Sequence, residues 1–190
     1  MSQQSNNLKL SLLLVVIALV ALLAGYGLRQ LLQGEATDTR YSDDASSEKS
    51  ILGQRRPDFS LPDLMDQTRS IDEWDGKVLL VNFWATWCPP CVREIPAFNQ
   101  LYESYKDKGF TIIGIALDNK QDVIDFIDPM SVEYPILLGD QQGIKLTQEY
   151  GNRLGVLPFS VIIDRQGRII ERHRNEITFE EAEQLIKPLL

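Results

Sequence analysis

The chain has 190 residues and a net charge of −8, which comes from 27 acidic and 19 basic side chains. This length accommodates one domain of ordinary size plus additional segments, and the acidic balance argues against nucleic acid as a partner. The chain contains two cysteines and one histidine. A structural zinc site needs about four such ligands, so we expect no metal site built from these residues alone.

An uncharged apolar run covers residues 10–28 and is bounded by Lys9 and Arg29. At about 1.5 Å of rise per residue, a helix of this length spans about 28 Å, which is enough to cross the core of a bilayer. A cleavable signal peptide is the alternative, but its apolar region would be only about 7–15 residues long. We therefore expect a short tail over residues 1–9 and a transmembrane anchor over residues 10–28.

From residue 33 to residue 54 the composition changes to Gly, Ser, Thr, Asp and Glu with few large apolar residues. This composition predicts a flexible, solvated linker, which we place over residues 29–54. The folded domain is expected to follow over residues 55–190. It opens with two short segments, residues 58–61 and 68–71, whose separation by a turn-rich stretch predicts a β-hairpin.

The apolar run from Val78 to Trp84 predicts a strand buried on both faces, and it leads directly into the two cysteines. Pro89 and Pro90 occupy the first positions of a predicted helix, where a missing N–H group is tolerated. Helical spacing then places Cys88 and Cys91 one turn apart on the same face, within reach of a local disulfide. The positive end of the helix dipole favours a thiolate at Cys88. We interpret the cysteines as a redox pair, with a metal site at a dimer interface or an inert disulfide as alternatives.

The sequence Phe-Trp-Ala-Thr-Trp-Cys-Pro-Pro-Cys, which ends at Cys91 and is followed by Glu94 and Pro96, resembles the active site of the thioredoxin superfamily. It is most similar to the membrane-tethered TlpA/ResA/CcmG group of thiol–disulfide oxidoreductases. The resemblance runs from about Pro57 to the C-terminus. It implies a thioredoxin-like α/β fold with an extra helix–strand unit near residues 121–138.

The later elements agree with this fold, because strands and helices alternate before a closing hairpin and helix. They predict a mixed sheet with helices on both faces, that is, a three-layer fold with an N-terminal β-hairpin, preceded by one transmembrane helix. The predicted elements are a helix from Cys91 to near Gly109 that Pro96 should kink, strands over 110–117, 135–138, 160–164 and 168–172, helices over 121–128 and 143–150, and a last helix opened by a capping box at Thr178 and Glu181.

Side chains alternate along a strand, so Asn82 should share a face with Leu80 and Trp84, beneath the cysteines. The resemblance implies an ionisable Asp at this position in thioredoxins proper, where it accepts the proton of the buried thiol. Asn cannot ionise, so we expect Glu94, three residues after Cys91, to accept that proton. A carboxylate near an apolar site should have a raised pKa. The alternative is that Glu94 is merely an exposed carboxylate near the start of the helix.

The resemblance also implies a substrate-binding region. Leu157-Pro158 occupies the position of the cis-proline loop, in which the backbone of the residue before the proline pairs with a bound extended peptide. The alternative is a proline that merely begins a strand. Phe159 departs from the small polar residue common at this position of the family. Trp87 is expected to shield Cys88 and to form part of the docking surface, whereas Trp84 is expected to pack in the core.

These features predict a protein-disulfide reductase in which the Cys88 thiolate attacks a partner's disulfide and Cys91 then resolves the mixed disulfide. The protein thiols carry the electrons, so we expect no cofactor. The resemblance implies an inner-membrane, single-pass protein, expected to be a monomer, with its catalytic domain on the periplasmic side. It implies oxidised exported proteins such as apocytochrome c as substrates and a membrane thiol reductase of the DsbD/CcdA type as electron donor.

Three alternatives remain at this point. The domain could work in the opposite direction, as a disulfide oxidase or isomerase. It could be a peroxiredoxin-like peroxidase, although the sequence lacks a Pro-x-x-x-Thr-x-x-Cys pattern. It could also be a non-catalytic thiol adaptor or copper-handling domain, although one histidine and one Cys-x-x-Cys make a poor ligand set.

Overall fold

The computed structural model of the chain describes residues 17, 19–26, 28–29 and 51–190. Residues 17, 19–26 and 28–29 are helical and expose large apolar side chains such as those of Leu22 and Leu23. Among the described residues, no helix is both long and apolar enough to cross a membrane. The predicted tail, the first part of the predicted anchor and residues 30–50 of the predicted linker lie outside the described residues, so the anchor stays a prediction.

A five-stranded mixed sheet forms the centre of the folded domain, with the strand order β5-β4-β3-β6-β7. The predicted buried strand, β3 (Val78–Trp84), lies in the middle of the sheet and is buried along its whole length. It pairs in parallel with β4 (Phe110–Ala116), which pairs in parallel with β5 (Ile136–Leu138). On its other side it pairs in antiparallel fashion with β6 (Phe159–Ile163), which pairs with β7 (Ile169–Arg174).

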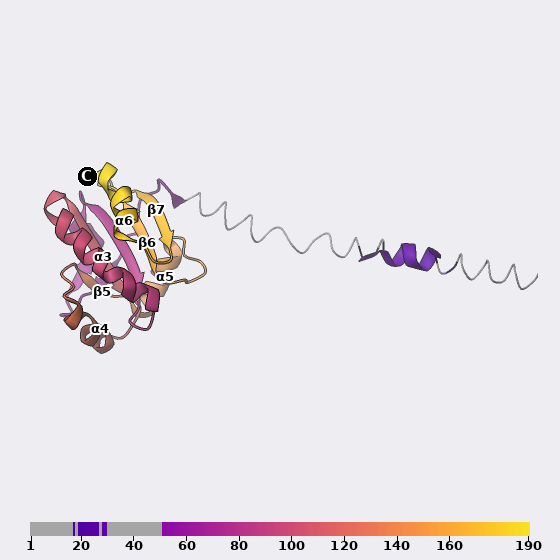
Figure 1. The fold of residues 1–190 in the computed structure, drawn as a ribbon, viewed down its shortest axis with the longest axis horizontal. Coiled ribbons are helices and arrows are strands. Elements are labelled where there is room, and N and C mark those ends of the chain that lie inside the picture. Colours follow the sequence, from indigo (N-terminus) through magenta and orange to yellow (C-terminus); the bar gives the residue numbers. More distant parts are fainter. Residues whose placement is uncertain (1–16, 18, 27, 30–50) are drawn as a thin grey trace, which may run out of the picture. The chain divides into compact units, whose positions relative to one another are not determined.

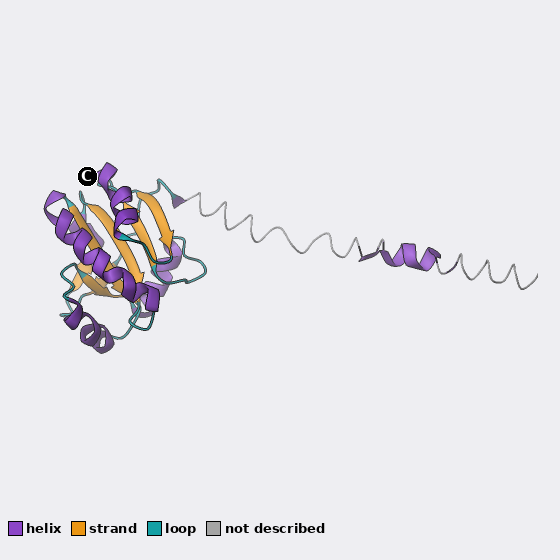
Figure 2. Cartoon of the chain, in the orientation of Figure 1, coloured by secondary structure: helices purple, strands orange, loops and turns teal. Residues whose placement is uncertain are grey.

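Helices cover both faces of this sheet, as the alternating order of elements predicted. Figure 1 shows α3 (Pro89–Tyr105) and α6 (Phe179–Ile186) in front of the strands. The core on that face also takes apolar residues from α4 (Lys120–Ile127). The opposite face packs against α5 (Asp140–Glu149) and an N-terminal hairpin. In Figure 2 the strands run between these helical layers, which makes the domain a three-layer α/β fold.

The predicted N-terminal hairpin is present as β1 (Ser60–Pro62) and β2 (Thr68–Ser70), which pair in antiparallel fashion. The predicted insertion is present as α4 and β5, between β4 and α5. The predicted capping box is also present, because Thr178 and Glu181 bond each other's backbone at the start of α6. Pro96 lies within α3, which continues past it; a short 3₁₀ turn then ends at Gly109, whose φ of 79° suits glycine.

The ordered domain begins earlier than the predicted boundary at residue 55. The Gly53 N–H donates to the Ile169 carbonyl at 2.7 Å, and the Ile169 N–H donates to the Gln54 carbonyl at 2.9 Å. Ile51 packs against the core on the α5 side of the sheet. Residues 51–54 therefore belong to the domain. The polar stretch before them suggested that the linker continues to residue 54, but the backbone hydrogen bonds to β7 and the packing of Ile51 place these residues in the domain.

Candidate active site

The two cysteines form a disulfide at the start of α3, with a Cα–Cα distance of 5.3 Å, and this confirms the predicted local bridge. Cys88 is the N-cap residue of α3, and Pro89 and Pro90 occupy its first two positions. The Cys88 side chain accepts no capping hydrogen bond. Cys91 is fully buried and Cys88 is 4% exposed. In this oxidised form, the only part of the disulfide that a partner can reach is therefore the slightly exposed Cys88.

A carboxylate that follows the neighbouring strand β4 holds the loop that leads from β3 into α3. Asp118, just after β4, accepts hydrogen bonds from the Thr86 N–H at 3.3 Å and from the Thr86 hydroxyl at 2.5 Å. This loop presents Trp87, which is 67% exposed, while Trp84 is buried in the core as predicted. The sequence analysis missed Asp118. The sequence did contain an indication of its position: Asp118 follows β4 as Thr86 follows β3, and the carboxyl ends of adjacent parallel strands meet at the same edge of a sheet.

Glu94 lies one helical turn after Cys91, in a buried polar network between α3 and the sheet. Asn82 on β3 donates from Nδ2 to Oε1 of Glu94 at 2.7 Å and to the hydroxyl of Ser160 at 3.0 Å. Ser160 lies directly opposite Asn82 on β6. The second carboxyl oxygen of Glu94 accepts the Ile177 N–H at 3.3 Å. The strand and helix periods thus bring Asn82 and Glu94 together on the face predicted for them.

Burial raises the pKa of Glu94 to about 8, while the hydrogen bonds from Asn82 and Ile177 oppose that rise. The carboxyl is only 1% exposed. The alternative of an exposed helix carboxylate is therefore wrong, and the expected rise in pKa is confirmed in direction. The rise brings the pKa of Glu94 closer to the range of a thiol, which eases proton transfer between the two groups.

The loop between β7 and α6 connects Glu94 with the proline loop. The Asn175 N–H donates to the Pro158 carbonyl at 3.2 Å, and two residues later the Ile177 N–H reaches Glu94. Between them, Glu176 forms an ion pair of 2.6 Å with Arg93 on α3. Sequence reasoning missed this loop, because no local pattern indicates that it crosses over the start of α3.

The Leu157–Pro158 peptide bond is cis, as the resemblance implied. Pro158 is buried at the start of β6, and Leu157 is half-buried. The Leu157 side chain packs against the core cluster that contains both cysteines and also against the cluster on the α5 side. Leu157 therefore lies where the two faces of the sheet meet near the disulfide.

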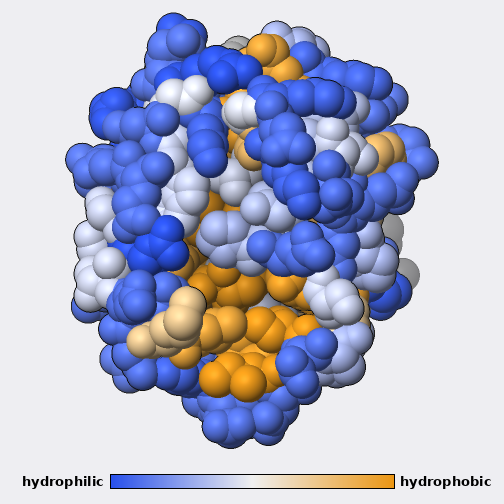
Figure 3. All heavy atoms as spheres, turned by 90° about the vertical axis from the view of Figure 1, so that its left-hand side faces the viewer, coloured by the Kyte–Doolittle hydropathy of each residue, from blue (hydrophilic) through white to orange (hydrophobic). Residues whose placement is uncertain are grey.

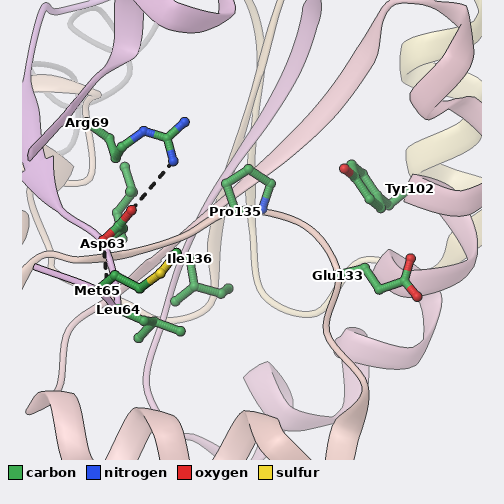
Figure 4. A pocket seen from close by; sticks show the side chains of 9 residues that line it. Asp63, Leu64, Met65, Arg69, Tyr102, Glu133, Pro135 and Ile136 are labelled. Atoms are coloured by element: carbon green, nitrogen blue, oxygen red, sulfur yellow. Dashed lines mark hydrogen bonds and ion pairs between the residues drawn. The ribbon is translucent and has the colours of Figure 1, made fainter. Parts of the chain in front are cut away.

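A surface hollow lies away from the cysteines, at the edge of the sheet formed by β5. Figure 3 views the side of the domain on which β5 and α4 lie and shows an apolar hollow among hydrophilic side chains. A hollow of about 250 Å³ is lined there by residues of the hairpin, α3 and β5, and Figure 4 shows Arg69 and Asp63 close together on one side of it, with Tyr102 and Glu133 on the other. Arg69 and Asp63 are ion-paired at 3.6 Å. Tyr102, also in its lining, is eleven residues beyond Cys91, or about 16 Å along α3.

Comparisons with known proteins agree with this geometry. The family model described as Redoxin matches residues 51–186. The chain belongs to the Redoxin family. It is 34% identical over 146 residues to the thiol-disulfide oxidoreductase ResA of Bacillus thuringiensis, covering 76% of this chain and 82% of that protein. The ResA of Halalkalibacterium halodurans is 34% identical over 140 residues, covering 72% and 77%.

Solved structures give the same result. A thiol:disulfide interchange protein of Chlorobium tepidum, described as DsbE, superposes with a TM-score of 0.66 at 30% identity, covering 73% of this chain and 96% of that one. StoA of Bacillus subtilis superposes with a TM-score of 0.57 at 26% identity, covering 68% and 96%. This Redoxin-family chain has a thioredoxin-like fold and is a thiol–disulfide oxidoreductase.

Proposed function

We propose that this Redoxin-family protein reduces disulfides in exported proteins, on the extracytoplasmic side of a membrane to which its N-terminal segment anchors it. The observation that carries the catalytic part is the Cys88–Cys91 disulfide together with the buried carboxyl of Glu94, one helical turn after Cys91. The uncharged run over residues 10–28 supports the anchor. The similarity to a thiol-disulfide oxidoreductase named ResA and a thiol:disulfide interchange protein named DsbE supports dithiol–disulfide exchange as the reaction.

The proposed reaction starts from the dithiol. The Cys88 thiolate attacks one sulfur of the partner's disulfide, which forms a Cys88–partner bond and releases the partner's other sulfur as a thiolate. Cys91 then loses its proton to the carboxylate form of Glu94 and attacks the Cys88 sulfur, which restores the Cys88–Cys91 bond and releases the second partner thiolate. Two electrons pass to the partner, and protons from Glu94 and water complete its two thiols. No cofactor takes part.

The docking residues are proposed to be Trp87, Leu157 and Pro158. Trp87 is exposed beside Cys88, and Leu157 offers backbone groups ahead of the cis-proline, to which an extended segment of the partner can pair. Oxidised exported proteins, including apocytochrome c, are the proposed substrates. A membrane thiol reductase of the DsbD/CcdA type is the proposed electron donor, and the protein is proposed to act as a monomer.

Trapping tests this proposal most directly. The full-length Cys91→Ala variant keeps the attacking thiol but cannot resolve the mixed disulfide, so it should accumulate covalent complexes with its substrates in the native membrane fraction. A matched Cys88→Ala variant keeps one thiol but should trap few or no partners. Mass spectrometry after non-reducing separation identifies the partners. Equal trapping by the two variants would contradict the assigned order of the cysteines, and trapping of cytoplasmic proteins alone would contradict the location.

The redox potential tests the direction. Equilibration of the wild-type protein with glutathione buffers should give a potential well below the value of about −120 mV that characterises strong periplasmic oxidants. A potential near that value would instead favour a disulfide oxidase.

A further inference from the structure

An apolar collar borders the disulfide on the side of Cys88. We use this name for Trp87, Ile144 and Leu157, which line one hollow, together with Leu154 and Val156, the exposed apolar residues of the loop that contributes Asn152 and Gly155 to the same lining. Leu154 is 71% exposed, Trp87 67% and Ile144 50%. Single exposed apolar residues are ordinary on protein surfaces, but several gathered around one site indicate a binding surface.

Three of the collar residues, Trp87, Ile144 and Leu157, line a hollow of about 180 Å³. Ligand sites for separate small molecules usually measure about 300–1,000 Å³, so this hollow is sized for a single side chain. Its lining contains no charged residue and comes from the β3–α3 loop, α5 and the loop before the cis-proline: Trp87, Leu117, Ile144, Thr147, Asn152, Gly155 and Leu157. An apolar occupant therefore fits it better than a charged one, because a charge would lose its hydration there without gaining a partner.

The loop that carries Leu154 is held in place by one buried side chain. Asn152 is fully buried, and its amide donates to the Val156 carbonyl at 2.8 Å and accepts the Val156 N–H at 3.2 Å. The Asn152 carbonyl also accepts the Gly155 N–H at 3.2 Å. These bonds close the loop on itself and leave Leu154 at its outer side. A surface that is ordered before binding loses less conformational entropy on binding.

The chemistry of the protein determines which molecule covers this hollow. In the mixed disulfide the partner's sulfur is bonded to Cys88, and Trp87 is the adjacent residue in the chain. An extended polypeptide advances about 3.3 Å per residue. The residues of the partner that lie two or three positions from its cysteine therefore lie about 7–10 Å from Cys88, over the collar.

We propose that the apolar collar binds a large apolar side chain located two or three residues from the reactive cysteine of an extended partner polypeptide. This inference rests on the proposed function and names its substrate class. Ile144, Leu154 and Val156 thereby become specificity-determining residues in addition to Trp87 and Leu157. Recognition of the flanking side chain, together with backbone pairing at Leu157, selects disulfides in extended segments over those buried in folded proteins.

The test uses full-length protein in detergent, reduced with dithiothreitol and freed from it. The substrates are glutathione mixed disulfides of unstructured ten-residue peptides that carry one cysteine and either leucine or serine two or three positions away. Each turnover converts the enzyme dithiol to its disulfide and releases the peptide thiol and glutathione. Because no reductant regenerates the dithiol, the reaction is a single turnover, and we expect its second-order rate constant to be about tenfold higher for the leucine peptides than for the serine peptides.

The variants Leu154→Ser and Ile144→Gln should remove most of this tenfold preference while leaving turnover of glutathione disulfide unchanged. Met65→Ser is the matched control, because Met65 is 75% exposed on the distant hairpin hollow, and it should retain the preference. Both collar residues are exposed, so these substitutions should not unfold the domain.

Each outcome bears on one proposal. Equal second-order rate constants for the leucine and serine peptides, with a normal rate of glutathione disulfide reduction, would overturn the collar proposal and leave the proposed function intact. Failure to reduce any disulfide would overturn the proposed function itself. A concentration-dependent dimer in analytical ultracentrifugation that Leu154→Ser abolishes would show that a second copy of the chain, rather than a substrate, covers the collar.

Discussion

One face of β3 is entirely apolar, whereas the other contains one polar side chain, that of Asn82. The proposed catalytic chemistry lies on the face that contains Asn82. Toward α5, the strand presents Leu79, Val81 and Phe83 to an apolar core. Toward α3, it presents Leu80, Asn82 and Trp84, and Asn82 is bonded to the carboxyl of Glu94. One face of the strand thus serves packing alone, whereas the other accepts a buried polar pair whose desolvation weakens the fold. A buried polar group without an evident gain in stability is a good indicator of function.

The largest predicted effect is a loss of stability on the apolar face of β3, which packs toward α5. Phe83 is fully buried between the rings of Tyr150 and Phe159, at centroid distances of 5.8 and 6.0 Å. Phe83→Ala should lower the free energy of unfolding by about 3–5 kcal/mol, because it removes a large side chain and leaves a cavity. Denaturant titration measures this. Exchange activity per folded molecule should change little, and a strong loss of activity in the folded fraction would mean that the two faces are coupled.

On the other face, the raised pKa of Glu94 should make the wild-type domain less stable as the pH rises. Between about pH 4.5 and 8 the folded state keeps a proton that the unfolded state releases, so unfolding becomes easier across this range. Glu94→Gln removes this dependence. We expect the stability of the variant relative to wild type to increase by on the order of 2–4 kcal/mol from pH 5 to pH 9. If the free energies of unfolding of wild type and Glu94→Gln changed in parallel with pH, Glu94 would titrate near its ordinary pKa in the folded state.

The same substitution should slow disulfide exchange about 10- to 100-fold near pH 7–8, because the buried Cys91 thiol loses its proton acceptor. Combining Glu94→Gln with Asn82→Asp reverses donor and acceptor in the 2.7 Å hydrogen bond and returns a carboxyl to the site, so the rate should partly recover. Stopped-flow Trp fluorescence with a model disulfide measures both variants. Wild-type rates for Glu94→Gln across pH 5 to 9 would assign this carboxyl a structural role only.

A smaller effect is expected at the start of α3, where Pro89 and Pro90 supply no N–H group toward the Cys88 sulfur. Pro90→Gly introduces one donor, which should stabilise the reduced form by about 1 kcal/mol. The reduction potential should therefore rise by about 20 mV. Equilibration with glutathione measures the change, and Pro96→Ala, farther along α3, is the control. A fall in potential would contradict this account of the two prolines.

The smallest effect concerns the loop that covers Glu94. The negative charge of Glu176 contributes to the raised pKa of Glu94, and Glu176→Gln removes this charge. The midpoint of the pH profile for exchange should move down by less than about one pH unit. Glu180→Gln, an exposed substitution in the first turn of α6, should leave the midpoint unchanged. An upward movement would indicate that the ion pair with Arg93 acts mainly by holding the Ile177 N–H against the carboxyl.

The sequence alone determined much of this protein. The apolar run before Cys88, the two prolines and the cysteine spacing specified a buried strand, a helix start and a local disulfide, because each depends on neighbours within one helical turn or along one strand. The strand period also placed Asn82 beneath the cysteines, and helical spacing placed Glu94 one turn after Cys91, whereas the hydrogen bond between them came from the structure. The cis state of Leu157–Pro158 came from resemblance, since nothing local at that proline required it.

Only the tertiary structure decided the remaining parts of the site. The Ile177 N–H reaches Glu94 across 83 residues, Asp118 reaches Thr86 across 32, and the collar joins α5 to two separate loops. The inclusion of residues 51–54 in the domain likewise depends on pairing with β7. Such contacts leave no period or spacing in the sequence, because they arise where segments distant along the chain pack against the same edge of the sheet.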